Sequence, residues 1–209
     1  MLKRIAVVLS TLTLAFFILG ISVFNSTSPR VFSASPKPTT PAIKTETETT
    51  SDYIFVYPGG ILPDSPFWYL KAIRDRIWLI VTTNPMRKAE LSLLFADKRI
   101  MTAQKLFENN KPQLALSTLT KAEKYLQNAA DIEARQRKGG VDTKSFLMTL
   151  AKASLAHITK IKELLSLAPD DVRPEMVKAG DYSRSVFQQS RSTLESYGML
   201  PPKNPFEGK

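Results

Sequence analysis

His157 is the chain's one histidine, and an imidazole is well suited to act as a general base near neutral pH. In that role it needs a nucleophile to activate and an acidic group to orient it. The sequence has no cysteine and no Gly-x-Ser-x-Gly elbow that would present a serine. We therefore interpret His157 as a structural histidine, partly buried or solvated, and we expect no enzyme activity.

Two other local patterns could bind ligands. The adjacent acids Asp170 and Asp171 could hold Ca²⁺, but no Asp-x-Asp-x-Asp-Gly loop surrounds them, so we interpret them as a helix cap. The glycines of "YPGG" (57–60) do not form a phosphate-binding loop, because no Gly-Lys-Ser/Thr follows. With one histidine and no cysteine, a His/Cys metal site is excluded, and we expect no cofactor.

Basic residues outnumber acidic ones, with a net charge of +10 and a pI of about 9.8. Such a balance suits an anionic neighbour, either phospholipid headgroups, a cell-wall polymer or nucleic acid, although a solvated helix surface has the same composition. One group flanks the turn Gly139-Gly140 and is a candidate anion-binding patch: Arg135, Arg137, Lys138 and Lys144. A second group, Lys71, Arg74 and Arg76, follows three consecutive aromatic residues.

The N-terminal part of the chain differs from the rest. Residues 5–24 carry no charge and follow Lys3 and Arg4, and a helix of this length spans the roughly 30 Å hydrocarbon core of a bilayer. We expect a signal anchor over 1–24 that leaves the remainder extracytoplasmic. The alternative is cleavage near Ser33-Ala34-Ser35 and secretion. Export makes a nucleic-acid partner improbable.

Residues 25–52 are rich in Ser, Thr and Pro and nearly free of large apolar side chains. Such a composition cannot offset the entropy of ordering, so we expect a disordered linker that tethers the next domain. The chain would then divide into a span (1–24), a linker (25–52), a helical bundle (53–198) and a C-terminal tail (199–209).

From residue 66 onward apolar residues recur with helical period, and breakers separate the segments. Helices are predicted at about 66–81, 85–108, 112–137 and 143–167, and a fifth is predicted from just after 170 or 171 to 197. Short loops imply antiparallel neighbours, so the predicted fold class is an all-α antiparallel bundle of about five helices. The first helix should turn Phe67, Leu70, Ile73, Ile77 and Ile80 toward the core. The aromatics Phe67, Trp68, Tyr69 and Trp78 should mainly anchor that core.

The segment "YPGGILPDSPFWYLK" (57–71), with "NPMRKAEL" (84–91) and "LLFADKR" (93–99), resembles a bacterial family known as a domain of unknown function. The likeness covers about residues 55–135. It implies an all-α domain that is exported and attached by one N-terminal helix, and it implies no activity and no catalytic residue. We interpret the motif as structural, the point where the fold begins: Pro58, Gly59, Leu62, Pro63, Asp64, Ser65, Pro66 and Phe67.

These observations predict a membrane-tethered extracytoplasmic helical module that is not an enzyme. Its partners would be the membrane, through a single N-terminal span, and an anionic envelope polymer or a protein. The alternative is an extracytoplasmic sensor or regulatory module of a membrane signalling complex. The short stretch before the apolar run, Met1 to Arg4, argues against direct signalling inward.

Overall fold

The structure is a computed structural model and describes residues 53–206. The predicted span over 1–24 and the predicted linker over 25–52 lie outside the described residues, so both stay predictions. Within 53–206, no helix is both long enough and apolar enough to cross a bilayer.

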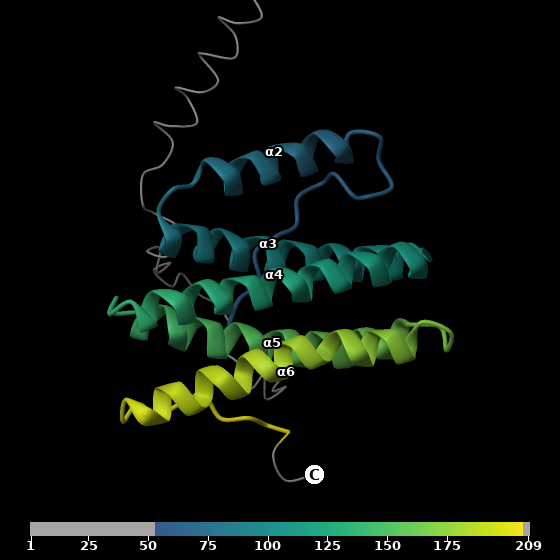
Figure 1. Cartoon of the computed structure of the whole chain (residues 1–209). Coiled ribbons are helices and arrows are strands. Elements are labelled where there is room, and N and C mark those ends of the chain that lie inside the picture. The colour runs from purple at the N-terminus through teal and green to yellow at the C-terminus, as the bar shows by residue number, and fades with distance from the viewer. Residues whose placement is uncertain (1–52, 207–209) are drawn as a thin grey trace, which may run out of the picture. The chain divides into compact units, whose positions relative to one another are not determined.

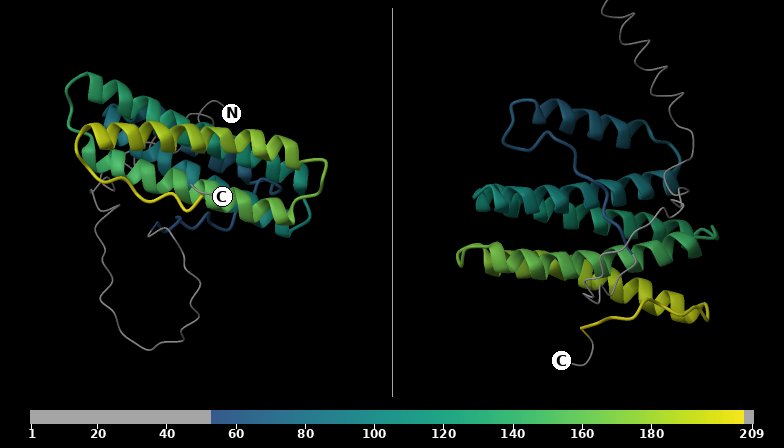
Figure 2. Two further views of the ribbon diagram at one scale, coloured as in Figure 1. Left: turned by 90° about the horizontal axis from the view of Figure 1, so that it is seen from below. Right: turned by 180° about the vertical axis from the view of Figure 1, so that it is seen from behind.

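Five helices make up the described part of the chain and pack antiparallel, which confirms the predicted all-α bundle (Figure 1). The helices α3 and α4 form one layer, and α5 and α6 form the next, while α2 lies outside α3 (Figures 1 and 2). Their bounds are α2 Trp68–Val81, α3 Pro85–Glu108, α4 Pro112–Lys138, α5 Lys144–Leu167 and α6 Arg173–Ser196.

The start of α3 follows directly from its sequence. Asn84 is the N-cap, and its side-chain oxygen accepts the Arg87 backbone N–H at 3.1 Å. Pro85 occupies the first helical position, where its missing N–H costs nothing. The helix ends at Glu108, and Asn110 takes a left-handed conformation with φ 56° as the chain reverses. Both predicted ends of this helix are confirmed.

The turn from α4 to α5 is formed at Gly139 and Gly140, as the sequence predicts. Gly139 is the C-cap of α4 with φ −79°, and the left-handed conformation falls on Gly140, at φ 85°. Thr143 is the N-cap of α5, and the neighbouring Asp142 accepts the Lys144 N–H through its Oδ1 at 3.1 Å. A glycine pair lets the chain reverse here without strain.

The interpretation of Asp170 and Asp171 as a helix cap is wrong. The N-cap of α6 is Val172, and no side chain caps it. Asp170 instead pairs with Arg173 at 2.6 Å, and Asp171 Oδ2 accepts a hydrogen bond from Gln113 at 3.1 Å. The hydrogen bond from Gln113 to Asp171 links the first turn of α4 to the loop that precedes α6.

The core of the bundle lies along one apolar stripe of each helix from α3 to α6, here called the seam, and these stripes have the helical period found in the sequence. Small alanines alternate with larger side chains in α3 and α4, which lets these two helices approach closely. The buried seam residues are Leu93, Ala96, Ile100, Ala103, Phe107, Ala115, Leu119, Ala122, Leu126, Ala129, Leu147, Ala151, Ile158, Ile161, Met176, Ala179, Val186 and Leu194. Leu165 is partly buried against them.

Candidate functional site

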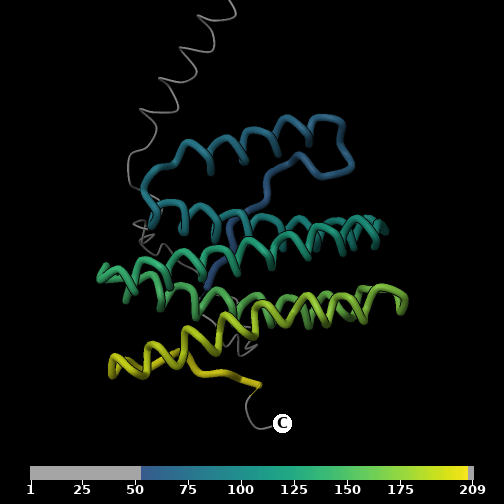
Figure 3. Tube along the Cα trace, viewed as in Figure 1, coloured from purple at the N-terminus to yellow at the C-terminus, as the bar shows by residue number. Residues whose placement is uncertain are grey.

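The segment before α2, residues 53–67, is here called the leading segment, and Figure 3 traces its path past α3 to the start of α2. Side chains of the helices and of the turn after α3 hold it in place. Lys71 Nζ donates to the carbonyl oxygens of Pro58 and Ile61, at 2.9 and 3.3 Å. Lys105 Nζ donates to the Tyr57 hydroxyl at 2.9 Å, and Lys111 pairs with Asp64. The leading segment is therefore an ordered strap fastened to α2, α3 and the start of α4.

The structural motif occupies this segment. Pro58 is buried, Gly59 takes φ 81°, and Leu62, Pro63 and Ser65 are half-buried, while Asp64, Pro66 and Phe67 are exposed. Ser65 Oγ accepts the Phe67 N–H at 3.3 Å, so it stabilises the turn that precedes α2. The helix itself begins at Trp68, two residues later than predicted, because residues 63–67 form turns.

The predicted core stripe of α2 faces solvent, which corrects the expectation from periodicity. Ile80 is 70% exposed, Leu70 is 67% exposed and Phe67 is 64% exposed, and Ile73 and Ile77 are more than half exposed. Among the helices that the structure describes, α2 packs only against α3, which covers one side of it. The periodic pattern identified an apolar face correctly, but nothing among the described residues covers that face.

The covered side of α2 carries the polar and aromatic residues. Asp75 is 4% exposed and pairs with Arg74 at 2.7 Å. Trp78 meets the ring of Phe95 on α3 edge to face, with the centroids 6.5 Å apart. Trp68 lies under the Lys71 ammonium, 5.0 Å from its ring centroid. Trp78 thus anchors α2 to α3 as predicted, whereas the contact of Trp68 stays within α2, and Phe67 and Tyr69 are exposed.

A cavity of about 520 Å³ lies between the leading segment, the start of α2 and α3. Its apolar wall comes from Tyr57, Ile61, Phe67 and Leu70 and is continuous with the exposed stripe. Three cations also line it: Lys71, Arg74 and Lys98. The cavity therefore combines an apolar surface with a local excess of positive charge.

That excess shows in the electrostatics of Lys71. Burial lowers the pKa of its ammonium below the ordinary value, and the positive charges of Lys98, Arg74 and Arg99 act in the same direction. Among residues 53–206, Asp75 is the one acid that acts on Lys71, and it opposes these effects. An anionic group in the cavity would relieve this repulsion.

A second polar site lies inside the bundle and joins α3, α4 and α5. The His157 ring is 0% exposed; its Nδ1 lies 2.7 Å from Glu123 Oε1 and its Nε2 lies 3.2 Å from Asp97 Oδ1. Tyr53, at the start of the leading segment, donates its hydroxyl to Asp97 Oδ2 at 2.7 Å. We call these four residues the buried charge cluster. The interpretation of His157 as partly buried or solvated is wrong.

The pKa of His157 is raised to about 9 although burial acts to lower it, because the charges of Glu123 and Asp97 and their hydrogen bonds prevail. The ring is then an imidazolium whose two N–H groups donate to the two carboxylates. Burial, with the Asp97 charge and hydrogen bond, raises the pKa of Tyr53 far above its usual range. The imidazolium has no free nitrogen to accept a proton, so the cluster holds a charge in the core rather than presenting a base.

Comparison with known proteins identifies the family. A family model described as a domain of unknown function, DUF5667, matches residues 60–171, which is more than half of the chain. The chain belongs to the DUF5667 family. No curated protein and no solved structure matches it.

The DUF5667 match includes α2 to α5 and ends before α6. It therefore contains the carboxylates and imidazole of the buried charge cluster and most of the cavity lining, but not Tyr57, Pro58 and Gly59. Tyr53 lies outside the matched residues, as does α6, which packs on α4 and α5. Within residues 53–206, no group of potential ligands could hold a metal ion.

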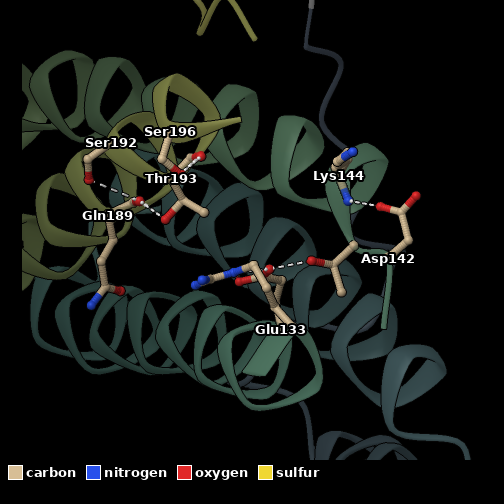
Figure 4. A network of polar contacts seen from close by, with 9 residues as sticks. Glu133, Asp142, Lys144, Gln189, Ser192, Thr193 and Ser196 are labelled. Carbon is tan, nitrogen blue, oxygen red and sulfur yellow. Dashed lines mark hydrogen bonds and ion pairs between the residues drawn. The ribbon is translucent and has the colours of Figure 1, made fainter. Parts of the chain in front are cut away.

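In the predicted basic patch of the DUF5667 domain, two of the four cationic side chains contact other residues of the domain. Arg137 Nε donates to the buried carboxylate of Glu133 at 3.0 Å, and Glu133 also accepts from Thr143 Oγ1 at 2.6 Å (Figure 4). Lys144 Nζ lies 5.3 Å from the ring centroid of Tyr197. The exposed residues Arg135 and Lys138 complete the patch. The four residues lie at the same end of the bundle, where α4 ends and α5 begins, but Arg137 and Lys144 each have a structural partner.

Sequence reasoning missed the buried charge cluster and the cavity for different reasons. Asp97 and Glu123 lie on the predicted helices three or four residues from seam positions, and this spacing could have marked them as inward-facing acids that require a cation. The cavity depends on how the leading segment folds back on α2, and no local pattern specifies that path.

Proposed function

We propose that this chain is a non-enzymatic, membrane-tethered extracytoplasmic module that binds a component of the cell envelope or a protein partner through α2. The observation that carries the proposal is the apolar stripe of α2. The helices α3 to α6 bury their apolar seams, whereas α2 has large aliphatic side chains that are exposed. Contiguous exposed apolar surface of this kind marks interaction sites.

Two further observations support this proposal. The apolar run over 5–24 and the Ser/Thr/Pro-rich residues 25–52 have the composition of an anchor and a tether. The buried charge cluster has no free base, and the cavity beside α2 contains cations and apolar side chains rather than a nucleophile paired with a base.

Site-specific photocrosslinking in intact cells tests the binding role. A photoreactive residue replaces Ile73 on the exposed stripe of the full chain, and a matched residue replaces Ser192, which is exposed on α6. We expect position 73 to crosslink to one dominant envelope component and position 192 to give no such product. Equal labelling from both positions would contradict a binding face on α2.

A separate assay tests the non-enzymatic part of the proposal. If the purified chain hydrolyses wall polymers or peptides, and a single polar substitution abolishes that hydrolysis, the chain is an enzyme and this part is wrong.

A sensor or regulatory module is the second candidate, and one contact favours it. The hydrogen bond from Tyr53 to Asp97 joins the residue that follows the predicted tether to the buried charge cluster. A change in the tether could therefore reach three helices of the core. A membrane partner that copurifies with the full chain, and is lost when residues 5–24 are exchanged for another anchor, would favour this candidate over simple binding.

A further inference from the structure

The exposed stripe of α2 has a charge pattern that specifies its occupant. On a helix of 3.6 residues per turn, Ile73, Ile77 and Leu70 fall in the middle of the apolar arc, and Arg74 and Arg76 fall at its two edges. No exposed acid lies on α2, because its only acid, Asp75, is buried beneath Arg74.

We infer that α2 lies in the plane of an anionic lipid bilayer, with its apolar stripe among the acyl chains and its arginines at the level of the lipid phosphates. This inference rests on the proposed function and names the envelope component. A helix with an apolar face and basic edges binds in this way, through buried apolar area and attraction to anionic lipid.

The cavity extends the positive charge beyond α2. Lys98 on α3 lines it beside Arg74, and the Lys98 ammonium has no hydrogen bond or ion pair with any described residue. The cations thus border the stripe along its edges and at its N-terminal end. The exposed rings of Phe67 and Tyr69 lie at the same end, and aromatic side chains of this type favour the lipid–water interface.

Charge argues against the two other occupants. A second copy of α2 packed on the stripe would bring arginines toward arginines, with no exposed acid on this helix to pair with them. The apolar run over 5–24 could cover the stripe, but it contains no acidic residue and would leave the bordering cations without partners. An anionic lipid surface satisfies both the apolar stripe and the cations.

The predicted tether would make the contact easy to form. A flexible chain over residues 25–52 has a root-mean-square span of roughly 30 Å, so the domain would stay close to the bilayer that holds the anchor. Tethering of this kind gives a high effective concentration, and a weak interfacial contact is then sufficient.

The chain has no cysteine, so single cysteines can be labelled cleanly with a nitroxide. The full chain carrying Ile73→Cys is reconstituted into phosphatidylcholine vesicles with and without phosphatidylglycerol. Ser192→Cys on α6, on the other side of the bundle from α2, is the matched control (Figure 2). With phosphatidylglycerol present, we expect the label at 73 to become accessible to oxygen dissolved in lipid and protected from a water-soluble nickel complex. The label at 192 should stay in water in both vesicles.

A charge variant tests the electrostatic part. Arg76→Gln with Lys98→Gln should lower the ratio of lipid-docked to free label at 73 by roughly 30-fold, from the usual contribution of two basic residues at an anionic surface. The control, Arg135→Gln with Lys138→Gln, removes the same charge from the patch at the end of α4 and should leave the ratio unchanged.

Three results would overturn the inference. If the chain floats with the vesicles but the label at 73 stays accessible to nickel, the lipid contact of α2 is wrong, while the membrane tether of the proposed function is supported. If the label is shielded only where spin–spin broadening shows a neighbouring label, a second copy is the occupant. If the chain does not float with vesicles of either composition, both the tether and the lipid contact are wrong.

Discussion

The Tyr53 hydroxyl donates a hydrogen bond of 2.7 Å to Asp97 Oδ2, and the other carboxylate oxygen of Asp97 lies 3.2 Å from His157 Nε2. One carboxylate thus holds both the start of the leading segment and the buried imidazole. The Tyr53 ring also packs edge to face on Phe55, which in turn meets the His157 ring at 5.4 Å. The segment that follows the predicted tether is therefore part of the core.

Tyr53→Phe should destabilise the domain by about 1–3 kcal/mol. The substitution keeps the ring but removes the donor, which leaves a carboxylate oxygen of the 2% exposed Asp97 without that partner. Urea unfolding of both proteins measures the difference. The control is Tyr57→Phe, whose hydroxyl accepts a hydrogen bond from Lys105 at the surface and should change the stability little. Equal effects of the two substitutions would contradict a special role for the Tyr53 contact.

Stability should fall as the pH rises through the range in which His157 titrates. The folded pKa of about 9 exceeds the unfolded value of about 6.5, so the stabilisation is complete below pH 6.5 and is lost as the pH rises to 9. The carboxylates that face the imidazolium come from α3 (Asp97) and α4 (Glu123), and Tyr53 from the leading segment completes the cluster. This rise in the pKa of His157 corresponds to roughly 3 kcal/mol in the free energy of unfolding.

The measurement is the free energy of unfolding at pH 6, 7.5 and 9 for the wild type and for His157→Gln. The variant should be less stable at pH 6, and its stability should depend less on pH over this range. A wild-type slope that persists in the variant would assign the pH dependence to other groups.

Two phenylalanines, Phe67 just before α2 and Phe95 on α3, test which residues belong to the core. Phe67 precedes α2 and is 64% exposed, so Phe67→Ala should cost less than about 1 kcal/mol. Phe95 on α3 is 1% exposed between Trp78 and Tyr125, so Phe95→Ala should cost about 3–5 kcal/mol. Thermal unfolding separates these values. A large loss at Phe67 would mean that the stripe of α2 packs against protein.

Periodicity predicted the bundle well because four of the helices bury the stripe that their sequences define. In α3, the cap Asn84, the first-turn Pro85 and the seam from Leu93 to Phe107 all indicate the same helix and the same buried side. Agreement between capping, helix propensity and pattern is what makes a segment predictable.

Periodicity did not predict which side of α2 is buried, since an apolar stripe shows that a face avoids water but not what covers it. The core of this domain is complete without Ile73 and Ile77, and α2 is anchored to α3 through the contact of Trp78 with Phe95. The buried charge cluster was missed because its residues come from segments far apart in the sequence. A lone histidine becomes informative only once Asp97 and Glu123 are seen beside it.

The caps of α3 and α6 give a last comparison between pattern and structure. Asn84 and Asp170 both have side chains that commonly cap helices, yet only Asn84 accepts a backbone N–H at a helix start. Asn84→Ala should therefore cost about 1 kcal/mol. Asp170→Ala should leave the unfolding midpoint unchanged, because the Asp170 side chain is 92% exposed and its pair with Arg173 is screened by solvent. Urea unfolding of the two variants under the same conditions measures both effects. A loss at Asp170 equal to that at Asn84 would mean that α6 begins before Arg173 and that the acidic pair caps it after all.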